Sequence, residues 1–220
     1  MSEIPTPHYI GTIELERRHA ARRAKRLEAK DFHGYLKLFD GHERFRPFLK
    51  IHRQLSDADY WQCLALVWDN IEVSYPDRFC WLMLFQSNRP GRHLLMSRSE
   101  HRTLAALPEV LTVFRGYAKS KGRNGLSWTL TESRARFFAI YASGPRRRYL
   151  CRHVENRPGM VVIGRCFKRD VLAYFDGRGE QEVVIAPDKV KLGRSYPIPV
   201  STGAAVKECS SASGHKQRSN

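Results

Sequence analysis

Apolar side chains recur at two different periods along this chain. In the N-terminal half, Trp61, Leu64 and Trp68 follow one another at helical spacing. This pattern predicts a helix over residues 58–71 whose aromatic side chains lie in the core. The apolar run 79–85 has no clear period, so it fits either a buried helix or a strand.

Two further helices are indicated before residue 108. Residues 14–30 favour a helix and are dense in arginine and lysine, with few apolar side chains to define a buried face. Ser97 and Glu100 have the spacing of a capping box in front of residues 101–107. This box predicts a short helix that ends at Pro108.

The C-terminal half reads differently, because short β-rich stretches alternate there with glycine, proline, asparagine and aspartate. We expect strands over residues 111–117, 126–130, 149–154, 160–167 and 182–185. Helices are expected over 132–141 and 169–175. Helices in the first half and strands in the second indicate an α+β fold.

Length and composition limit the number of domains. With 220 residues, of which 42% are hydrophobic, the chain can build one well-buried domain with an appended helix, but not two ordinary catalytic domains. We divide it into a basic N-terminal helical segment (1–57), a single domain (58–200) and a tail (201–220). The tail is nearly free of large apolar groups and is expected to be disordered.

The net charge of +16 predicts attraction to polyanions, whether nucleic acid, an acidic protein or a dinucleotide. The basic helix over 14–30 is accordingly either a contact with such a partner or a solvated surface helix. No apolar run approaches the length of a membrane span, and no N-terminal stretch has the form of a signal peptide. We therefore expect a soluble cytoplasmic protein without a membrane partner.

Cysteine and histidine give no sign of a metal site. The five cysteines are scattered without a C-x-x-C pair, so reduced thiols are expected, and none of the nine histidines has zinc-site spacing. The chain also lacks the G-x-G-x-x-G and G-x-x-x-x-G-K-[ST] loops. Any NAD that it binds is therefore expected to lie outside a Rossmann crevice.

Three short polar blocks lie on predicted strands. They are Arg115 with Gly116, Ser127 with Thr129, and Glu180 with Glu182. Side chains two residues apart on a strand point to the same face, so each pair of hydroxyls or carboxylates is expected to act on one ligand. An arginine fork suits phosphate or a ribose hydroxyl, and a glycine beside it lets a ligand approach the backbone.

In this order the blocks resemble the Arg, Ser-x-Thr/Ser and Glu-x-Glu motifs of the ADP-ribosyltransferases, which transfer ADP-ribose from NAD to a target. The resemblance covers residues 112–186 and implies an ADP-ribosyltransferase-like split β-sandwich for domain 58–200, with a helical region before it. Phe114 stands where the family often has tyrosine. Residues 176–179 stand where it has a target-recognition loop. The chain is also similar to small transferases of bacteria and phages that modify host or competitor proteins.

The resemblance implies a role for each block. Glu182 bonds the nicotinamide ribose and is the main catalytic group, while Glu180 presents or deprotonates an acceptor arginine. The implied cofactor-binding residues are Arg115 for phosphate and ribose, Gly116 for the nicotinamide amide, Ser127 for the ribose and the catalytic glutamate, and Thr129 in the third motif position.

The leading hypothesis is therefore an NAD-dependent mono-ADP-ribosyltransferase that modifies arginine in a protein. A second hypothesis keeps the enzyme and makes nucleic acid the acceptor, which the charge of +16 permits. A third is a non-catalytic basic module that binds nucleic acid. The basic stretch 146–148 could serve the NAD pyrophosphate or an acidic target.

Overall fold

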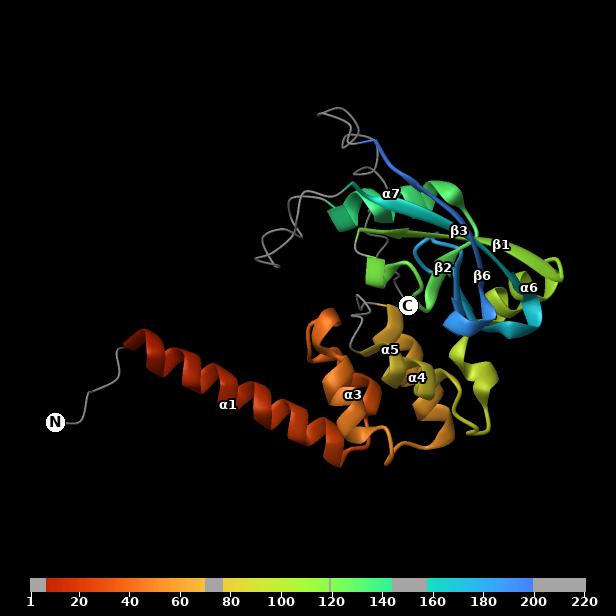
Figure 1. Cartoon of the computed structure of the whole chain (residues 1–220). Coiled ribbons are helices and arrows are strands. Elements are labelled where there is room, and N and C mark those ends of the chain that lie inside the picture. Colours follow the sequence, from red (N-terminus) through yellow and green to blue (C-terminus); the bar gives the residue numbers. More distant parts are fainter. Residues whose placement is uncertain (1–6, 70–76, 119, 144–157, 200–220) are drawn as a thin grey trace. The chain divides into compact units, whose positions relative to one another are not determined.

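The computed structural model describes residues 7–69, 77–118, 120–143 and 158–199, with side chains from residue 13 onwards (Figure 1). The expected strand 149–154, the basic stretch 146–148 and the expected tail 201–220 lie outside these ranges. None of the helices within them combines the length and apolar character needed to cross a membrane.

Contacts divide the chain into two compact units, here called the helical unit and the sheet unit. The helical unit comprises Met1–Leu107 with Leu172–Phe175, and the sheet unit comprises Pro108–Val171 with Asp176–Asn220. The boundary between the units lies after residue 107, whereas the main domain was expected to begin at residue 58. Helices in one unit and an antiparallel sheet in the other make the protein α+β, as expected.

The helical unit contains the first six α-helices of the chain. They are α1 (Pro7–Glu28), α2 (Phe32–Lys37), α3 (Phe45–Ile51), α4 (Asp57–Asp69), α5 (Arg78–Phe85) and α6 (Arg98–Ala106). Helix α4 confirms the expected helix over 58–71, and α5 shows that the run 79–85 is helical. The capping box is also confirmed, because Ser97 and Glu100 bond each other's backbone at the start of α6.

Aromatic side chains fill the core of the helical unit. Trp61 and Trp68 of α4 are buried, as the helical spacing predicts. The Trp68 ring meets Trp81 edge-on at 5.0 Å and Phe85 at 4.8 Å between ring centroids. Edge-to-face pairs of this kind add to the stabilisation that burial alone provides.

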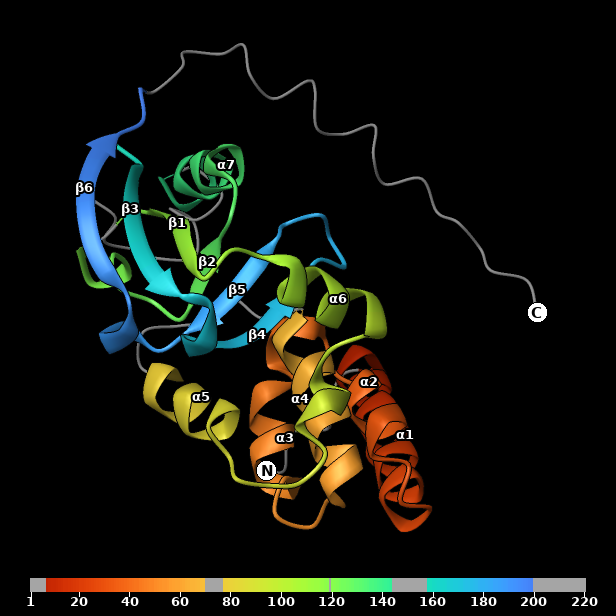
Figure 2. The same cartoon turned by 90° about the vertical axis from the view of Figure 1, so that its right-hand side faces the viewer.

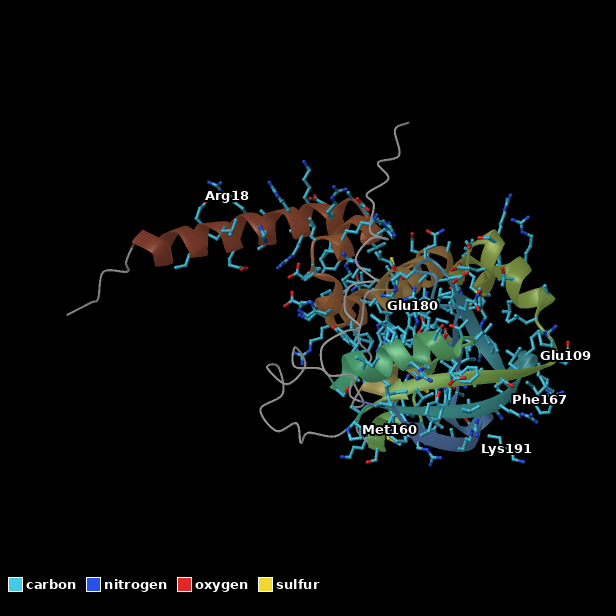
Figure 3. All side chains as sticks on the ribbon, turned by 90° about the horizontal axis from the view of Figure 1, so that it is seen from above. Arg18, Glu109, Met160, Phe167, Glu180 and Lys191 are labelled. Atoms are coloured by element: carbon cyan, nitrogen blue, oxygen red, sulfur yellow. The ribbon has the colours of Figure 1, made fainter. Side chains whose placement is uncertain are left out.

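Helix α1 is the solvated basic helix expected over 14–30. It starts earlier than predicted, at Pro7, because proline suits the first position of a helix. Nearly all its described side chains are exposed, and Figure 3 shows Arg18 projecting from it. Near its end Arg23 lies over the Phe39 ring, 4.2 Å from the centroid.

Five strands of the sheet lie wholly in the sheet unit. They are β1 (Val110–Tyr117), β2 (Ser127–Thr129), β3 (Met160–Phe167), β5 (Glu182–Ile185) and β6 (Lys191–Pro197), in the spatial order β5-β2-β1-β3-β6. All of their pairings are antiparallel. Helix α7 (Glu132–Ser143) packs beside β1 and β3, with Ala135 and Ala139 against Val161 (Figure 2).

One expected helix is wrong. Residues 168–170 form a short 3-10 turn, and β4 (Val171–Phe175) replaces the helix expected over 169–175. Valine, tyrosine and phenylalanine within these five residues favour a strand, and the run is too short for helical periodicity to outweigh them. Strand β6 was not expected, because its lysine, glycine, arginine and proline are typical of an exposed edge rather than of a core strand.

Candidate functional site

The three polar blocks lie on neighbouring strands of the sheet unit. Arg115 and Gly116 are on β1, Ser127 and Thr129 are on β2, and Glu182 is the first residue of β5. The spatial order β5-β2-β1 places the strand of the hydroxyls between the strands of the acid and the arginine. Segments far apart in the sequence are thereby brought side by side.

Thr129 and Glu182 face each other across β2 and β5. Opposite residues of an antiparallel pair project to the same face, and Ser127, two positions before Thr129, shares that face. Thr129 is 4% exposed and Glu182 is 8% exposed, whereas Ser127 is half-buried. Carboxylates are seldom this deeply buried.

The Thr129 hydroxyl holds the chain just before β5. It donates a hydrogen bond of 2.6 Å to the carbonyl oxygen of Glu180 and accepts one of 3.2 Å from the backbone N–H of Thr131. These bonds make Thr129 a positioning residue for the first acid. Direct contact of Thr129 with a cofactor stays a prediction from the resemblance.

Residues 176–181, which we call the acid loop, form a tight turn. Gly179 has φ +62° and Gln181 has φ +45°, so both adopt the left-handed conformation. Asp176 closes the turn: its carbonyl accepts from Gly179 N–H at 2.9 Å and its Oδ1 accepts from Gln181 N–H at 3.1 Å. The left-handed Gln181 separates the two acids, so the strand begins at Glu182.

Because of this turn, the two acids do not lie on one face of a strand, as was expected. Alternation along a strand was expected to place Glu180 and Glu182 on one face, but Glu180 precedes the strand. Its side chain is 16% exposed, and Glu180 Oε2 accepts a hydrogen bond of 3.0 Å from Arg178 Nη2. The backbone thus gives the acids different surroundings: Glu182 is buried in the sheet, and Glu180 lies nearer to solvent beside a guanidinium.

Arg134 of α7 also holds the acid loop. Its Nε donates to the carbonyl of Gly179 and its Nη2 to the carbonyl of Arg178, both at 3.1 Å. Left-handed glycine leaves such carbonyls without strand partners, and a guanidinium fork can bind two of them. Arg134 was not expected here, because no local sequence pattern links it to a loop more than forty residues away.

Arg115 lies where β1 and β2 separate. Strand β1 pairs with β3 along its whole length, but it is aligned with β2 only at Phe114 and Thr129. Beyond that pair, the guanidinium donates to the carbonyls of Ser127 and, at 2.7 Å, Gly122. Arg115 therefore supplies hydrogen bonds where the ladder between the two strands ends.

Arg115 and Glu182 leave their strands toward opposite faces. Phe114 is aligned with Thr129, so Phe114, Thr129 and Glu182 share one face and the next residue, Arg115, starts from the other. Arg115 therefore contacts Ser127 at its backbone carbonyl. Ser127, Thr129 and Glu182 therefore share one face, whereas Arg115 starts from the opposite face and Glu180 precedes the strand.

Gly116 is required by helix α7. A Cβ on this residue would lie 2.1 Å from the carbonyl oxygen of Ala135 and 2.4 Å from the backbone nitrogen of Ala139. The close approach that the sequence suggested for a ligand is thus made by the helix. Contact of Gly116 with the nicotinamide amide stays a prediction.

The arrangement offers groups for a sugar and for a cationic acceptor. A half-buried hydroxyl and a buried carboxylate on one face, Ser127 and Glu182, suit ribose, and the more exposed Glu180 suits a guanidinium. Among the described residues, no three histidine, cysteine, aspartate or glutamate side chains are grouped closely enough to hold a metal ion. Comparisons with protein-family models, curated proteins and solved structures found no match.

Proposed function

We propose that the protein is an NAD-dependent mono-ADP-ribosyltransferase that modifies arginine in an acceptor protein. The observation that carries this proposal is the buried Glu182 opposite Thr129, with Ser127 on the same face of adjacent strands. The resemblance of the three blocks to the transferase motifs supplies the identity of the reaction. The adjacency of β2 and β5 supplies a physical reason for Ser127 and Glu182 to act together.

The chemistry requires a fixed negative charge beside a sugar. When the bond between nicotinamide and ribose breaks, positive charge develops on the ribose, as in glycoside hydrolysis. A carboxylate held against that charge lowers the barrier without having to reorganise. Glu182 is suited to this role, because burial keeps water from screening its charge.

Glu180 is suited to the acceptor. Its carboxylate accepts a bond from the Arg178 guanidinium at 3.0 Å, so this acid is accessible to an arginine side chain. A carboxylate in that place can orient an acceptor guanidinium and take its proton. Its position outside the buried strand allows an acceptor to arrive from solvent.

The proposal is tested with NAD labelled in its adenine moiety and, separately, in its nicotinamide. We expect release of nicotinamide and transfer of ADP-ribose to an arginine-containing protein. Glu182→Gln strongly lowers both, and Glu109→Gln, which changes an exposed acid ion-paired with Lys168, lowers neither. Activity that survives Glu182→Gln unchanged would refute the proposal.

A second candidate places nucleic acid as the acceptor. It is favoured by α1, where Arg17, Arg22 and Lys25 are exposed on a solvated helix. Such side chains can bind phosphates without reading sequence. Digestion of the labelled product separates the two: loss of label with protease supports a protein acceptor, and loss of label with nuclease supports a nucleic acid.

A further inference from the structure

Arg178, an arginine of the protein itself, is ion-paired with Glu180, the acid that we propose binds the acceptor arginine. Arg178 Nη2 lies 3.0 Å from Glu180 Oε2, and the Arg178 side chain remains 47% exposed. The contact is an ordinary charge-assisted hydrogen bond between a guanidinium and a carboxylate. It has the geometry that an incoming acceptor arginine would need.

The acid loop presents this arginine in a defined place. Glycines flank it on both sides, and a Cβ on Gly177 would meet no atom within 4 Å, so the loop tip is open. Below the tip, Arg134 binds the carbonyls of Arg178 and Gly179, and Thr129 binds the carbonyl of Glu180. The backbone is thus held from two elements while the guanidinium stays accessible.

We propose that Arg178 is an internal acceptor, so that each molecule transfers ADP-ribose to its own Arg178. This inference rests on the proposed function and goes beyond it by naming an acceptor residue. Two observations carry it: the ion pair with Glu180, and the position of both residues in the loop that leads directly into Glu182.

A bond forms between a guanidinium nitrogen of Arg178 and C1 of the nicotinamide ribose, while the bond from that carbon to the nicotinamide nitrogen breaks. Nicotinamide leaves with the electron pair of the broken bond and becomes neutral. Glu180 accepts the proton that the guanidinium nitrogen loses, and the proton then passes to solvent.

The ion pair does not block the reaction. A guanidinium has three nitrogens, so Glu180 can hold Nη2 of Arg178 while another nitrogen reaches the sugar. Because acceptor and acid belong to one loop, the step is intramolecular and needs no second protein molecule. The rate per molecule should therefore not depend on protein concentration.

The test uses the full chain with saturating NAD, followed by peptide mapping for the mass of ADP-ribose. We expect modification of the peptide that contains Arg178, with an unchanged fraction modified per unit time on serial dilution. Arg178→Lys keeps the charge but lacks a guanidinium, and should abolish modification of this peptide. The matched control is Arg136→Lys, since the Arg136 side chain is 49% exposed and also pairs with a glutamate.

The outcomes separate this inference from the proposed function. Nicotinamide release with ADP-ribose on an added protein, but none on Arg178, overturns the inference alone. Modification that slows on dilution also overturns it, since the transfer is then between molecules. Absence of nicotinamide release under any condition removes both proposals. Circular dichroism of Arg178→Lys confirms that lost labelling is not lost folding.

Discussion

The two units bury different kinds of side chain. The helical unit is filled by large aromatics such as Trp61, Trp68 and Trp81, whereas the buried polar side chains that the structure describes, Thr129 and Glu182, both lie in the sheet unit. Burying a carboxylate lowers stability unless it is bonded, while burying tryptophan raises it. The aromatic core thus stabilises the helical unit, while the side chains of the proposed site are buried in the sheet unit.

Backbone conformation shows the same contrast. Among the described residues of the helical unit, the non-glycine residue with positive φ is Lys30, which follows the end of α1, where left-handed residues are common. In the sheet unit it is Gln181, which lies between the two acids. A strained residue held by surrounding bonds is typical of a functional site. In the acid loop, the backbone strain at Gln181 lowers local stability, and the left-handed conformation sets the positions of Glu180 and Glu182.

The largest expected effect is on the helical unit. Trp61→Ala removes a fully buried ring whose Nε1 donates to the Pro90 carbonyl at 2.8 Å. Large-to-small changes of this kind cost about 3–5 kcal/mol of unfolding free energy. Chemical denaturation measures this loss. If the loss were below about 1 kcal/mol, the aromatic core would not be the source of stability that the comparison makes it.

Two buried cysteines report on the units separately. Burial raises the pKa of Cys63 in the helical unit to about 12 and that of Cys166 in the sheet unit to about 11. A raised pKa means little thiolate at neutral pH, so both should react slowly with thiol reagents until their unit opens. In Trp61→Ala we expect Cys63 to react faster and Cys166 to stay protected. Equal acceleration at both would show that the units unfold together.

The next effect is on catalysis. Glu182→Gln keeps the shape of the side chain and removes its charge, so nicotinamide release should fall by roughly 100- to 1,000-fold. Stability should change little, because the amide keeps the shape of the side chain and costs less to bury than a carboxylate. Steady-state assays and thermal denaturation of the same preparation measure the two. A loss of activity that accompanies unfolding would make Glu182 structural.

Much of the fold could be predicted from local patterns. The strands over 160–167 and 182–185 have the expected bounds, because a run of β-branched and apolar residues is bounded by polar or turn residues. The helix around Trp61 follows from aromatic spacing alone. Residues 169–175 were wrong because so short a run carries no decisive period.

The site could be predicted only as a set of blocks. Sequence spacing says nothing about the adjacency of β5, β2 and β1, which depends on pairing between distant segments. Sequence spacing also does not predict the left-handed conformation of Gln181, whose N–H is bonded by Asp176. Nor does it predict the hydrogen bonds from Arg134 to the loop. These features arise from tertiary contacts, and they decide how Glu180 and Glu182 differ.

A smaller effect is expected at the separation of β1 and β2. Arg115→Lys keeps the charge but loses the fork that binds the carbonyls of Gly122 and Ser127. Hydrogen bonds from a charged donor contribute about 1.5–3 kcal/mol, which sets the expected loss of stability in the sheet unit. The affinity for NAD, measured by calorimetry, should fall as well.

Arg123→Lys is the matched control for that variant. Arg123 donates to Ser195 Oγ and to the Gly193 carbonyl on β6, away from the three blocks. We expect it to lower stability without changing NAD affinity. Equal NAD affinity in the Arg115 and Arg123 variants would reduce Arg115 to a structural arginine and remove it from the site.

The smallest expected effect separates positioning from catalysis within the sheet unit. Thr129→Val replaces a hydroxyl by a methyl of similar size and removes the bond to the Glu180 carbonyl, which should cost about 1 kcal/mol. Thr129→Ser retains the hydroxyl and should restore that bond. Because the bond holds Glu180 rather than Glu182, Thr129→Val should impair transfer to arginine more than NAD hydrolysis. If both activities fell equally and serine did not restore them, Thr129 would contact the sugar itself. The position of Glu180 would then depend on the bonds that Arg134 and Asp176 make to the loop.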